Sequence, residues 1–188
     1  MRRAFKHIST IHTGLFAKPV AQGEIIYLQA KHFRENGRLS SILHPDLKAD
    51  NQTKKHLLKP GDVLFAAKAT KNFAALYEFQ NQPAVASTTF FVIRILENFS
   101  DKILPEFLIW FLNHPITQKL LKGKARGTSL ASISKVVLEE LEISVPSLVT
   151  QKKVLQISKL RNTEIKLKQQ IEALREQQIQ QQLLKVLK

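Results

Sequence analysis

The sequence predicts an α+β protein, in which a globular domain with a mixed sheet and helices precedes a long C-terminal coiled-coil helix. Strand-like segments come first and helix-like segments later, as expected of an α+β fold rather than of alternating βα units. The stretch Gln151–Lys188 contains no Gly or Pro and consists mostly of strong helix formers. We therefore assign residues 1–148 to the globular domain and residues 149–188 to the helix.

Composition narrows the class of protein. The chain has 188 residues, 44% of them hydrophobic, so a folded core is expected. It has no Cys, which excludes disulfides, Cys-ligated zinc and thiol catalysis. No apolar run is as long as a membrane span, and the N-terminal segment MRRAFKHIST lacks the apolar stretch of a signal peptide. We expect a cytoplasmic protein with no membrane partner.

The charge balance is strongly basic. The chain has 29 Lys and Arg against 15 Asp and Glu, a formal net charge of +14. Such a balance attracts polyanions, and nucleic acid is the commonest of these in a cytosol. A membrane surface is the weaker alternative, because the long helix lacks the Trp and Phe wedge of an interfacial helix.

The first half of the chain is predicted to form strands separated by turns and basic loops. Residues 1–23 are expected to be irregular, and residues 44–60 to form a loop or short turns. Strands are predicted where apolar residues run between turn signals, at residues 24–30, 63–67, 73–79 and 84–95. The last of these is expected to be a central strand, because both of its alternating faces are largely apolar.

The second half is predicted to be mainly helical. Pro105 begins a helix whose apolar residues repeat at helical spacing, and His114-Pro115 kinks or ends it. Alternating apolar and polar residues at 141–145 predict a half-buried strand that ends at Pro146. Thr150 is the expected N-cap of the long helix.

The long helix carries an apolar stripe that needs a partner. Five residues occupy heptad a and d positions, namely Ile157, Leu160, Leu167, Ile171 and Leu174. Glu164 takes an a position within the stripe, and the apolar face changes phase after Leu174. One such helix, roughly 55 Å long, cannot bury its stripe alone, which favours dimerisation through a coiled coil. The alternative is a terminal helix that folds back onto its own domain.

No catalytic constellation stands out in the sequence. No two of the six His have the spacing of a helical zinc site, and acidic residues are too dispersed for a metal nuclease. A Walker motif, a nucleophile elbow and a dinucleotide-binding fingerprint are all absent. We therefore expect a non-catalytic chain that holds no cofactor and no metal.

Three basic loops are the candidate DNA-binding segments: residues 31–38 (the first basic loop), 68–72 (the second) and 122–135 (the third). The third has two Gly, several hydroxyl side chains and no acid, a composition that binds phosphates. The others carry side chains that can read base edges. The candidate residues are Lys31, Arg34, Arg38, Lys68, Lys71, Asn72, Lys122, Lys124, Arg126, Thr128, Ser129 and Lys135. The alternative is that these are ordinary solvated loops.

Several motifs, in this order along the chain, resemble a known family. They are 23-GEIIYLQA-30, 58-LKPGDVLF-65, 104-LPEFL-108, Gly127-Thr128-Ser129 with Ile133-Ser134-Lys135, and 138-LEELEISVP-146 before a helix that begins with Gln151. Together they resemble the DNA specificity subunit of type I restriction–modification systems over nearly the whole chain. The resemblance implies a target recognition domain that reads one half of a bipartite site in double-stranded DNA.

The resemblance also implies partners. The helical region of such subunits acts as a ruler and docks the methyltransferase (modification) subunits and, through them, the restriction subunit. The family's usual member has two recognition domains and two helical regions, whereas this chain has one of each. We therefore expect a half-length form that homodimerises through residues 149–188 to rebuild the two-domain arrangement.

Two other functions remain open from the sequence. The chain is alternatively an interaction protein whose coiled coil is the functional part and whose basic domain binds nucleic acid without sequence preference. A nuclease or methyltransferase is a third and weaker alternative. An enriched motif in a binding-site selection distinguishes the first function from the second.

Overall fold

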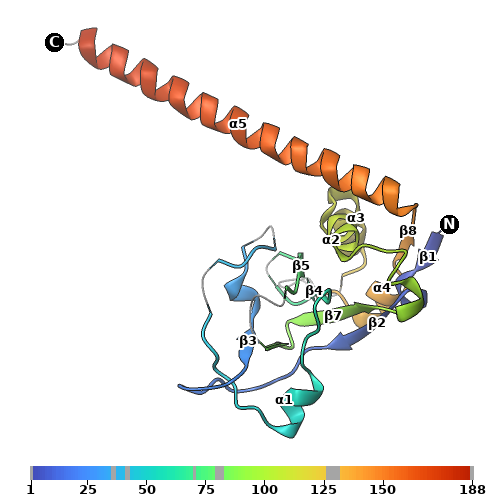
Figure 1. Cartoon of the computed structure of the whole chain (residues 1–188). Coiled ribbons are helices and arrows are strands. Elements are labelled where there is room, and N and C mark those ends of the chain that lie inside the picture. Colours follow the sequence, from blue (N-terminus) through green and yellow to red (C-terminus); the bar gives the residue numbers. More distant parts are fainter. Residues whose placement is uncertain are drawn as a thin grey trace. The chain divides into compact units, whose positions relative to one another are not determined.

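The computed structural model describes residues 2–34, 37–40, 43–69, 71–78, 83–125 and 132–186. The chain divides into two compact units, Met1–Leu148 and Val149–Lys188. The first contains mixed sheets and short helices, and the second is a single helix (Figure 1). The predicted α+β class is therefore confirmed.

A four-stranded antiparallel sheet forms the centre of the first unit. Its order is β2 (Ser9–Thr13), β7 (Phe90–Ile95), β4 (Val63–Ala66) and β5 (Ala74–Leu76). The first four residues of β7 are buried, which confirms the prediction of a central strand covered on both sides. The predicted strand 84–95 is in fact two strands, because residues 87–89 turn the chain between β6 (Ala84–Ala86) and β7.

Two further strand pairs lie among the described residues of the first unit. The strand β3 (Ile26–Leu28) runs parallel to β6. The strand β1 (Arg2–Ala4) pairs antiparallel with β8 (Glu142–Ser144). The segment 1–23, expected to be irregular, thus contributes two strands and the 3-10 turn η1 (Phe5–His7). Its alternation was missed because each of these strands has at most five residues.

The helices of the first unit are short. Among the described residues they are the α-helices α1 (Asn51–Lys55), α2 (Pro105–Asn113), α3 (Pro115–Gly123) and α4 (Lys135–Glu139) and the 3-10 turns η2 (Ala30–His32) and η4 (Glu97–Phe99). Pro105 and Pro115 each begin a helix, as a ring-fixed φ permits at the first position. The helix α1 lies where only loop or short turns were expected. Asp50 caps it, accepting from the Gln52 and Thr53 amides (2.9 and 2.7 Å).

The turn before β4 is built around a buried carboxylate. Asp62 is 1% exposed, and its Oδ2 accepts from the Lys59 amide (2.8 Å). Arg94 of β7 donates to both carboxylate oxygens, from Nε at 2.7 Å and from a terminal nitrogen at 2.6 Å. Gly61 has φ +89°, which favours Gly at this position. The sequence Lys59-Pro60-Gly61-Asp62 therefore fixes where β4 begins.

The second unit is the helix α5 (Leu148–Val186), drawn in orange and red in Figure 1. Its 39 residues give a length of about 59 Å. It begins at Leu148, so Thr150 lies inside the helix and is not its N-cap. Its stripe residues are 50–67% exposed: Ile157, Leu160, Leu167, Ile171 and Leu174. No helix in the described part of the chain combines the length and hydropathy needed to cross a membrane.

Candidate nucleic-acid interface

The second and third basic loops meet where β4 ends. The second basic loop is the turn between β4 and β5. The Ala67 carbonyl, directly after β4, accepts from the Ile133 amide (3.1 Å), which anchors the C-terminal end of the third basic loop. Lys68 and Lys71 are exposed on this turn. Two segments more than fifty residues apart in sequence are therefore neighbours.

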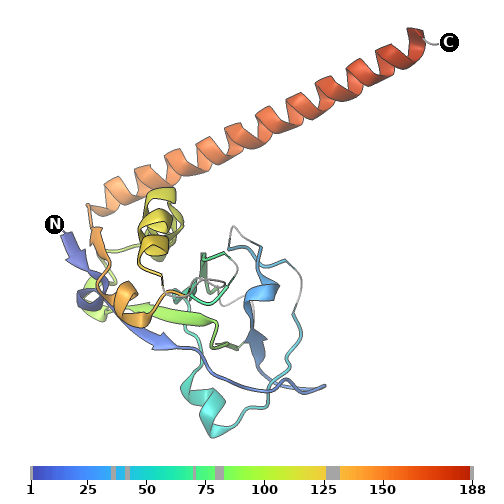
Figure 2. The same ribbon diagram turned by 180° about the vertical axis from the view of Figure 1, so that it is seen from behind.

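The first basic loop lies beside the same hairpin. A Cβ atom added to Gly37 would lie 2.4 Å from the Ala74 carbonyl oxygen, so the loop backbone contacts the start of β5. Figures 1 and 2 show the chain after β3 lying next to the β4–β5 turn from both sides. The first and second basic loops therefore meet at one edge of the first unit, where Ile133 of the third basic loop is also anchored. We call this edge, formed by the described residues of 31–38 and 67–74 with Ile133, the hairpin edge.

A cluster of aromatic side chains packs in the core next to the hairpin edge. The rings of Phe33, Phe73 and Phe90 lie 5.5 to 6.0 Å apart, in tilted or edge-to-face contact. Phe73 and Phe90 are buried, and Phe33 from the first basic loop packs against them. Such pairs add about 0.5–1.5 kcal/mol each beyond the area that they bury. The only sequence signal for this role was an aromatic residue placed inside a basic loop.

The first basic loop has a defined conformation. Phe33 and Leu39 form an isolated antiparallel bridge, and the Arg34 amide donates to the Arg38 carbonyl (2.8 Å). Gly37 has φ +76°, as the tight reversal requires. Arg34 and Arg38 are both exposed, on opposite sides of this turn. The loop thus presents two guanidinium side chains from a short, hydrogen-bonded backbone.

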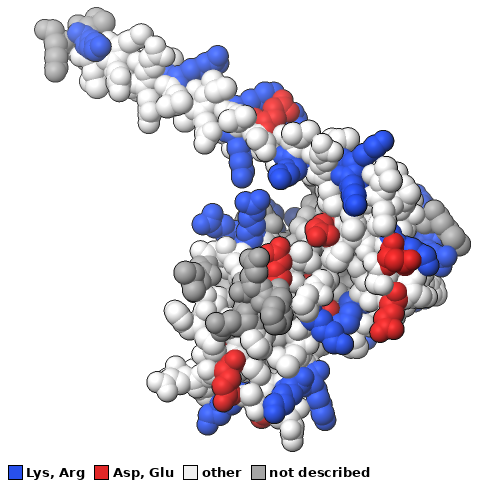
Figure 3. Space-filling model, viewed as in Figure 1, with Lys and Arg blue, Asp and Glu red and all other residues white. Residues whose placement is uncertain are grey.

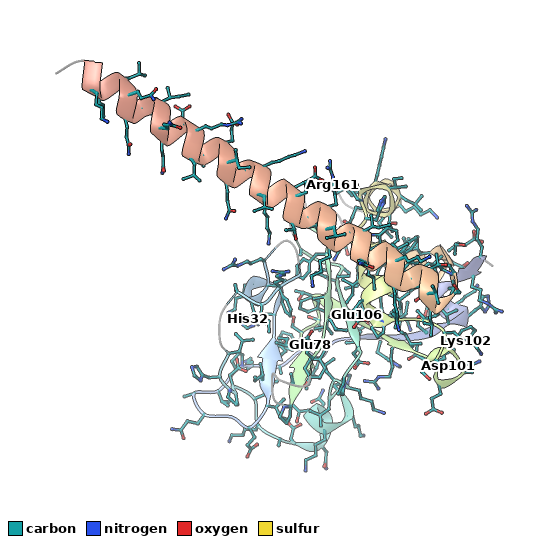
Figure 4. All side chains as sticks on the ribbon, turned by 45° about the horizontal axis from the view of Figure 1, so that its top comes forward. His32, Glu78, Asp101, Lys102, Glu106 and Arg161 are labelled. Carbon is teal, nitrogen blue, oxygen red and sulfur yellow. The ribbon has the colours of Figure 1, made fainter. Side chains whose placement is uncertain are left out.

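The neutral imidazole of His32 fixes the start of the first basic loop. Burial lowers its pKa and neighbouring Lys31 lowers it further, against a smaller opposing effect of Asp46. The Gln29 amide donates to His32 Nδ1 (3.2 Å), which requires an unprotonated nitrogen. Figure 4 labels His32 on the first unit. His32 therefore orients the backbone next to exposed Lys31.

Asn72 does not project from the hairpin edge, contrary to expectation. Its side chain is 5% exposed, and its Nδ2 donates to the Ala66 and Ala67 carbonyls (2.8 and 3.2 Å). Both amide protons are used inside the turn, so none is left for a base edge. Asn72 shapes the second basic loop, and we remove it from the DNA-reading candidates.

Acidic residues from outside its acid-free stretch lie near the lysines of the third basic loop. Lys135 forms an ion pair with Glu139 (3.4 Å) one helical turn later. Lys124 helps to lower the pKa of the Glu140 carboxyl, after the larger effect of Lys6. Lys122 is exposed. Arg126, Thr128 and Ser129 lie outside the described residues.

In the described part of the chain, no group of three or more His, Cys, Asp or Glu is placed to hold a metal ion.

Two comparisons with known proteins find related molecules. The family described as the type I restriction modification DNA specificity domain matches residues 16–176. A chain from a structure of complex assembly and conformational transition of the type I R-M system is similar at TM-score 0.64 and 14% identity, over 88% of this chain and 38% of that one. The HsdS subunit from Thermoanaerobacter tengcongensis is similar at TM-score 0.61 and 14% identity, with 88% and 38% covered.

A third solved structure extends the comparison. The type I restriction–modification S subunit from M. genitalium gives TM-score 0.50 at 14% identity, over 76% of this chain and 33% of that one. At such identities these structures share the fold with this chain, which spans little more than a third of their length. A search of curated proteins finds no significant match.

Proposed function

Because this chain belongs to the family of type I restriction modification DNA specificity domains, we propose that it is the DNA-recognition subunit of a type I restriction–modification complex. The meeting of the first and second basic loops at the hairpin edge, where Ile133 of the third loop is anchored, carries this proposal. Nucleic-acid recognition needs cations for phosphates and planar donors for base edges on one surface. The hairpin edge offers both on a scaffold held by buried aromatic rings.

In this proposal the candidate residues of the three basic loops take two roles. Arg34, Arg38 and Lys71 read base edges, because guanidinium and ammonium donors match the acceptors of guanine. The remaining candidates bind phosphates and set the register of the domain on the duplex: Lys31, Lys68, Lys122, Lys124, Arg126, Thr128, Ser129 and Lys135. Lys124 and Lys135 contribute less charge, because acidic groups neighbour them.

Catalysis belongs to other subunits in this proposal. The chain recognises DNA and binds methyltransferase subunits, and through them the restriction subunit. The methyl-donor cofactor is bound by the methyltransferase subunits.

The second unit is proposed to form an antiparallel homodimer. The stripe of α5 is symmetric about the midpoint between Ile165 and Lys166. Pairing about that point sets Ile157 opposite Leu174 of the other copy, and Leu160 opposite its Ile171. Every a position then meets a d position, and Glu164 falls beside the two-fold axis. Closed two-fold pairing is the commonest way to cover such a face.

The dimer defines the DNA site that it recognises. In an antiparallel pair, each recognition domain is joined to the start of its own α5, and these two helix starts lie at opposite ends of the coil, about 50 Å apart. At about 3.4 Å per base pair, this corresponds to about one and a half turns of duplex. Two identical domains related by a two-fold axis read identical half-sites on opposite strands. The target is therefore an interrupted palindrome, whose spacer length is set by α5.

A competition experiment tests sequence recognition separately from general DNA affinity. A labelled duplex obtained by binding-site selection is bound by the purified chain, and unlabelled selected or scrambled duplexes compete. We expect the selected duplex to compete at least a hundredfold better than the scrambled one, at the low end of specific recognition. Equal competition would contradict the proposal. It would favour a coiled-coil interaction protein that binds nucleic acid without sequence preference.

A further inference from the structure

Most described cations of α5 lie on two different faces of the helix, whereas Lys153 occupies a d position of the apolar stripe. Lys152, Lys159 and Lys166 repeat at intervals of seven residues, so they form one nearly straight row. Arg161 and Lys168 lie on the other face, and both pair with Glu164 at 2.7 Å. Figure 4 labels Arg161, and Figure 3 shows Lys and Arg along the length of this helix, with few acidic side chains on the face drawn.

The lysine row lacks acidic partners within the described chain. Lys152, Lys159 and Lys166 are all exposed, and none forms an ion pair with another described residue. On the other face even Arg175 has a partner, Glu172, at 3.7 Å. Charge on this helix is therefore segregated, with net positive charge on one face and mixed charge on the other.

The two faces lie on opposite sides of the apolar stripe. At about 100° per residue, the lysine row lies about 130° to one side of the midline of the stripe, and the paired cations lie about 70° to the other side. In an antiparallel pair, the two-fold axis runs perpendicular to both helices through the seam. Rotation about it brings the two lysine rows onto the same broad face of the coil, and the paired charges onto the opposite face.

We propose that this lysine face, formed by Lys152, Lys159 and Lys166 of both copies, binds the phosphate backbone of the DNA spacer between the two half-sites. The inference rests on the proposed homodimer and adds a second DNA surface to it. The two-fold axis that relates the half-sites also passes through the coil, so the spacer must cross that axis. Duplex DNA carries about one negative charge per 1.7 Å of its length. The lysines of the two copies extend over about 40 Å of the coil, so they can contact phosphates of any spacer sequence.

The lysine face gives the spacer an affinity that is independent of its sequence. A contact to phosphates specifies no base, which suits DNA whose sequence is not read. Lysine fits this role because its compact charge sits on a flexible stem and imposes no bidentate geometry. The paired cations of the opposite face are already neutralised by Glu, so counterion release from DNA favours the lysine face.

A matched pair of double variants tests the proposal. Lys159→Gln/Lys166→Gln removes two cations per copy from the lysine face, and Lys168→Gln/Arg175→Gln removes two from the opposite face. The dissociation constant for the selected full site is measured against salt concentration. We expect the lysine-face variant to flatten the salt dependence by about 0.9 per lost phosphate contact and the other variant to leave it unchanged. Light scattering verifies that both remain dimers.

A half-site duplex without the spacer completes the test. There, the lysine-face variant should bind as the unmodified chain does. Equal loss on half-site and full site, equal loss in both variants, or unchanged binding of the lysine-face variant to the full site would each overturn the proposal. Unchanged DNA binding together with lost binding of an acidic protein would also overturn it. Failure of the proposed function is separately visible, since the unmodified chain would then select no motif.

Discussion

Asp62 joins two strands through one buried carboxylate. It accepts from the Lys59 amide before β4 and from both donors of Arg94 on β7. Asp62→Ala leaves the Arg94 charge and the Lys59 amide without this partner. We expect a loss of about 3 kcal/mol in the free energy of unfolding, at the low end for a buried pair because Arg94 is 33% exposed. Chemical denaturation measures it.

The matched control is a solvent-exposed ion pair. Glu140→Ala removes the ion pair between Lys6 and Glu140, whose side chains are 42% and 55% exposed. An exposed pair contributes little, so the denaturation midpoint should not move measurably. If Asp62→Ala and Glu140→Ala had equal effects, Asp62 would not be the structural centre of this turn.

Arg34 and Arg38 carry the prediction on base readout. Each is exposed, and the Arg34 amide donates to the Arg38 carbonyl. Replacing either by Ala should cost about 1–3 kcal/mol at one position of the DNA motif and relax the preference there. Binding to a panel of single-base variants of the site measures this. Lys55→Ala, an exposed change on α1 outside all three basic loops, is the control. Uniform weakening on all sequences would assign the arginines to phosphates.

Glu164 makes α5 sensitive to acid. Hydrogen bonds from Lys168 and Arg161 lower the pKa of this carboxyl from 4.5 to about 2. A depressed pKa stabilises the folded helix above pH 4.5, and the stabilisation is lost as the pH falls toward 2. Helicity followed by circular dichroism should decline over that window in the unmodified chain, and less in Glu164→Gln. Glu176→Gln should behave as the unmodified chain, and an identical decline in all three would contradict this role.

Side-chain types in the sequence did not reveal which loop residues face solvent. Asn72 has the chemistry of a base reader, yet its amide is used within its own turn. The partners of Lys124 and Lys135 were equally hidden, since an acid-free run can fold against acids from α4 and the residue after it. Such assignments depend on backbone placement, which local composition does not determine.

At the scale of elements, periodicity and turn chemistry predicted much of the fold. The strand β4 follows the expected turn, α2 begins at Pro105, and β8 precedes Pro146. The misses are short. The helix α1 has five residues and is held by its Asp50 cap rather than by an apolar face. The turn between β6 and β7 was missed because residues 87–89 contain no Gly or Pro.

The stripe of α5 carries the prediction on assembly. Replacing Leu160, Leu167 and Leu174 with Asp puts charge at three d positions, which a coiled-coil seam cannot bury. We expect monomers by light scattering at micromolar concentration, with lost affinity for the full site and weak half-site binding retained.

The control uses the same substitution on another face. Ile165, Ile179 and Leu183 are exposed on α5 but lie outside the stripe. Their replacement by Asp should leave the dimer intact. A monomeric unmodified chain, or equal dissociation of both triple variants, would contradict dimerisation through the stripe.

At the scale of the whole molecule, the sequence predicted the basic loops but not their meeting. Their convergence depends on long-range contacts, such as the hydrogen bond from Ile133 to Ala67 and the packing of Phe33 on Phe73 and Phe90. No local signal encodes these contacts. The order of motifs predicted the family, and the tertiary structure brings the first two basic loops and Ile133 together.

The central claim is that two identical copies read one DNA site. Selection of bound duplexes from a random pool, with the unmodified chain alone, tests it most directly. We predict an enriched motif made of two identical half-sites in inverted orientation, separated by a spacer of fixed length and variable sequence. A motif without dyad symmetry, or a pool without an enriched motif, would contradict the account.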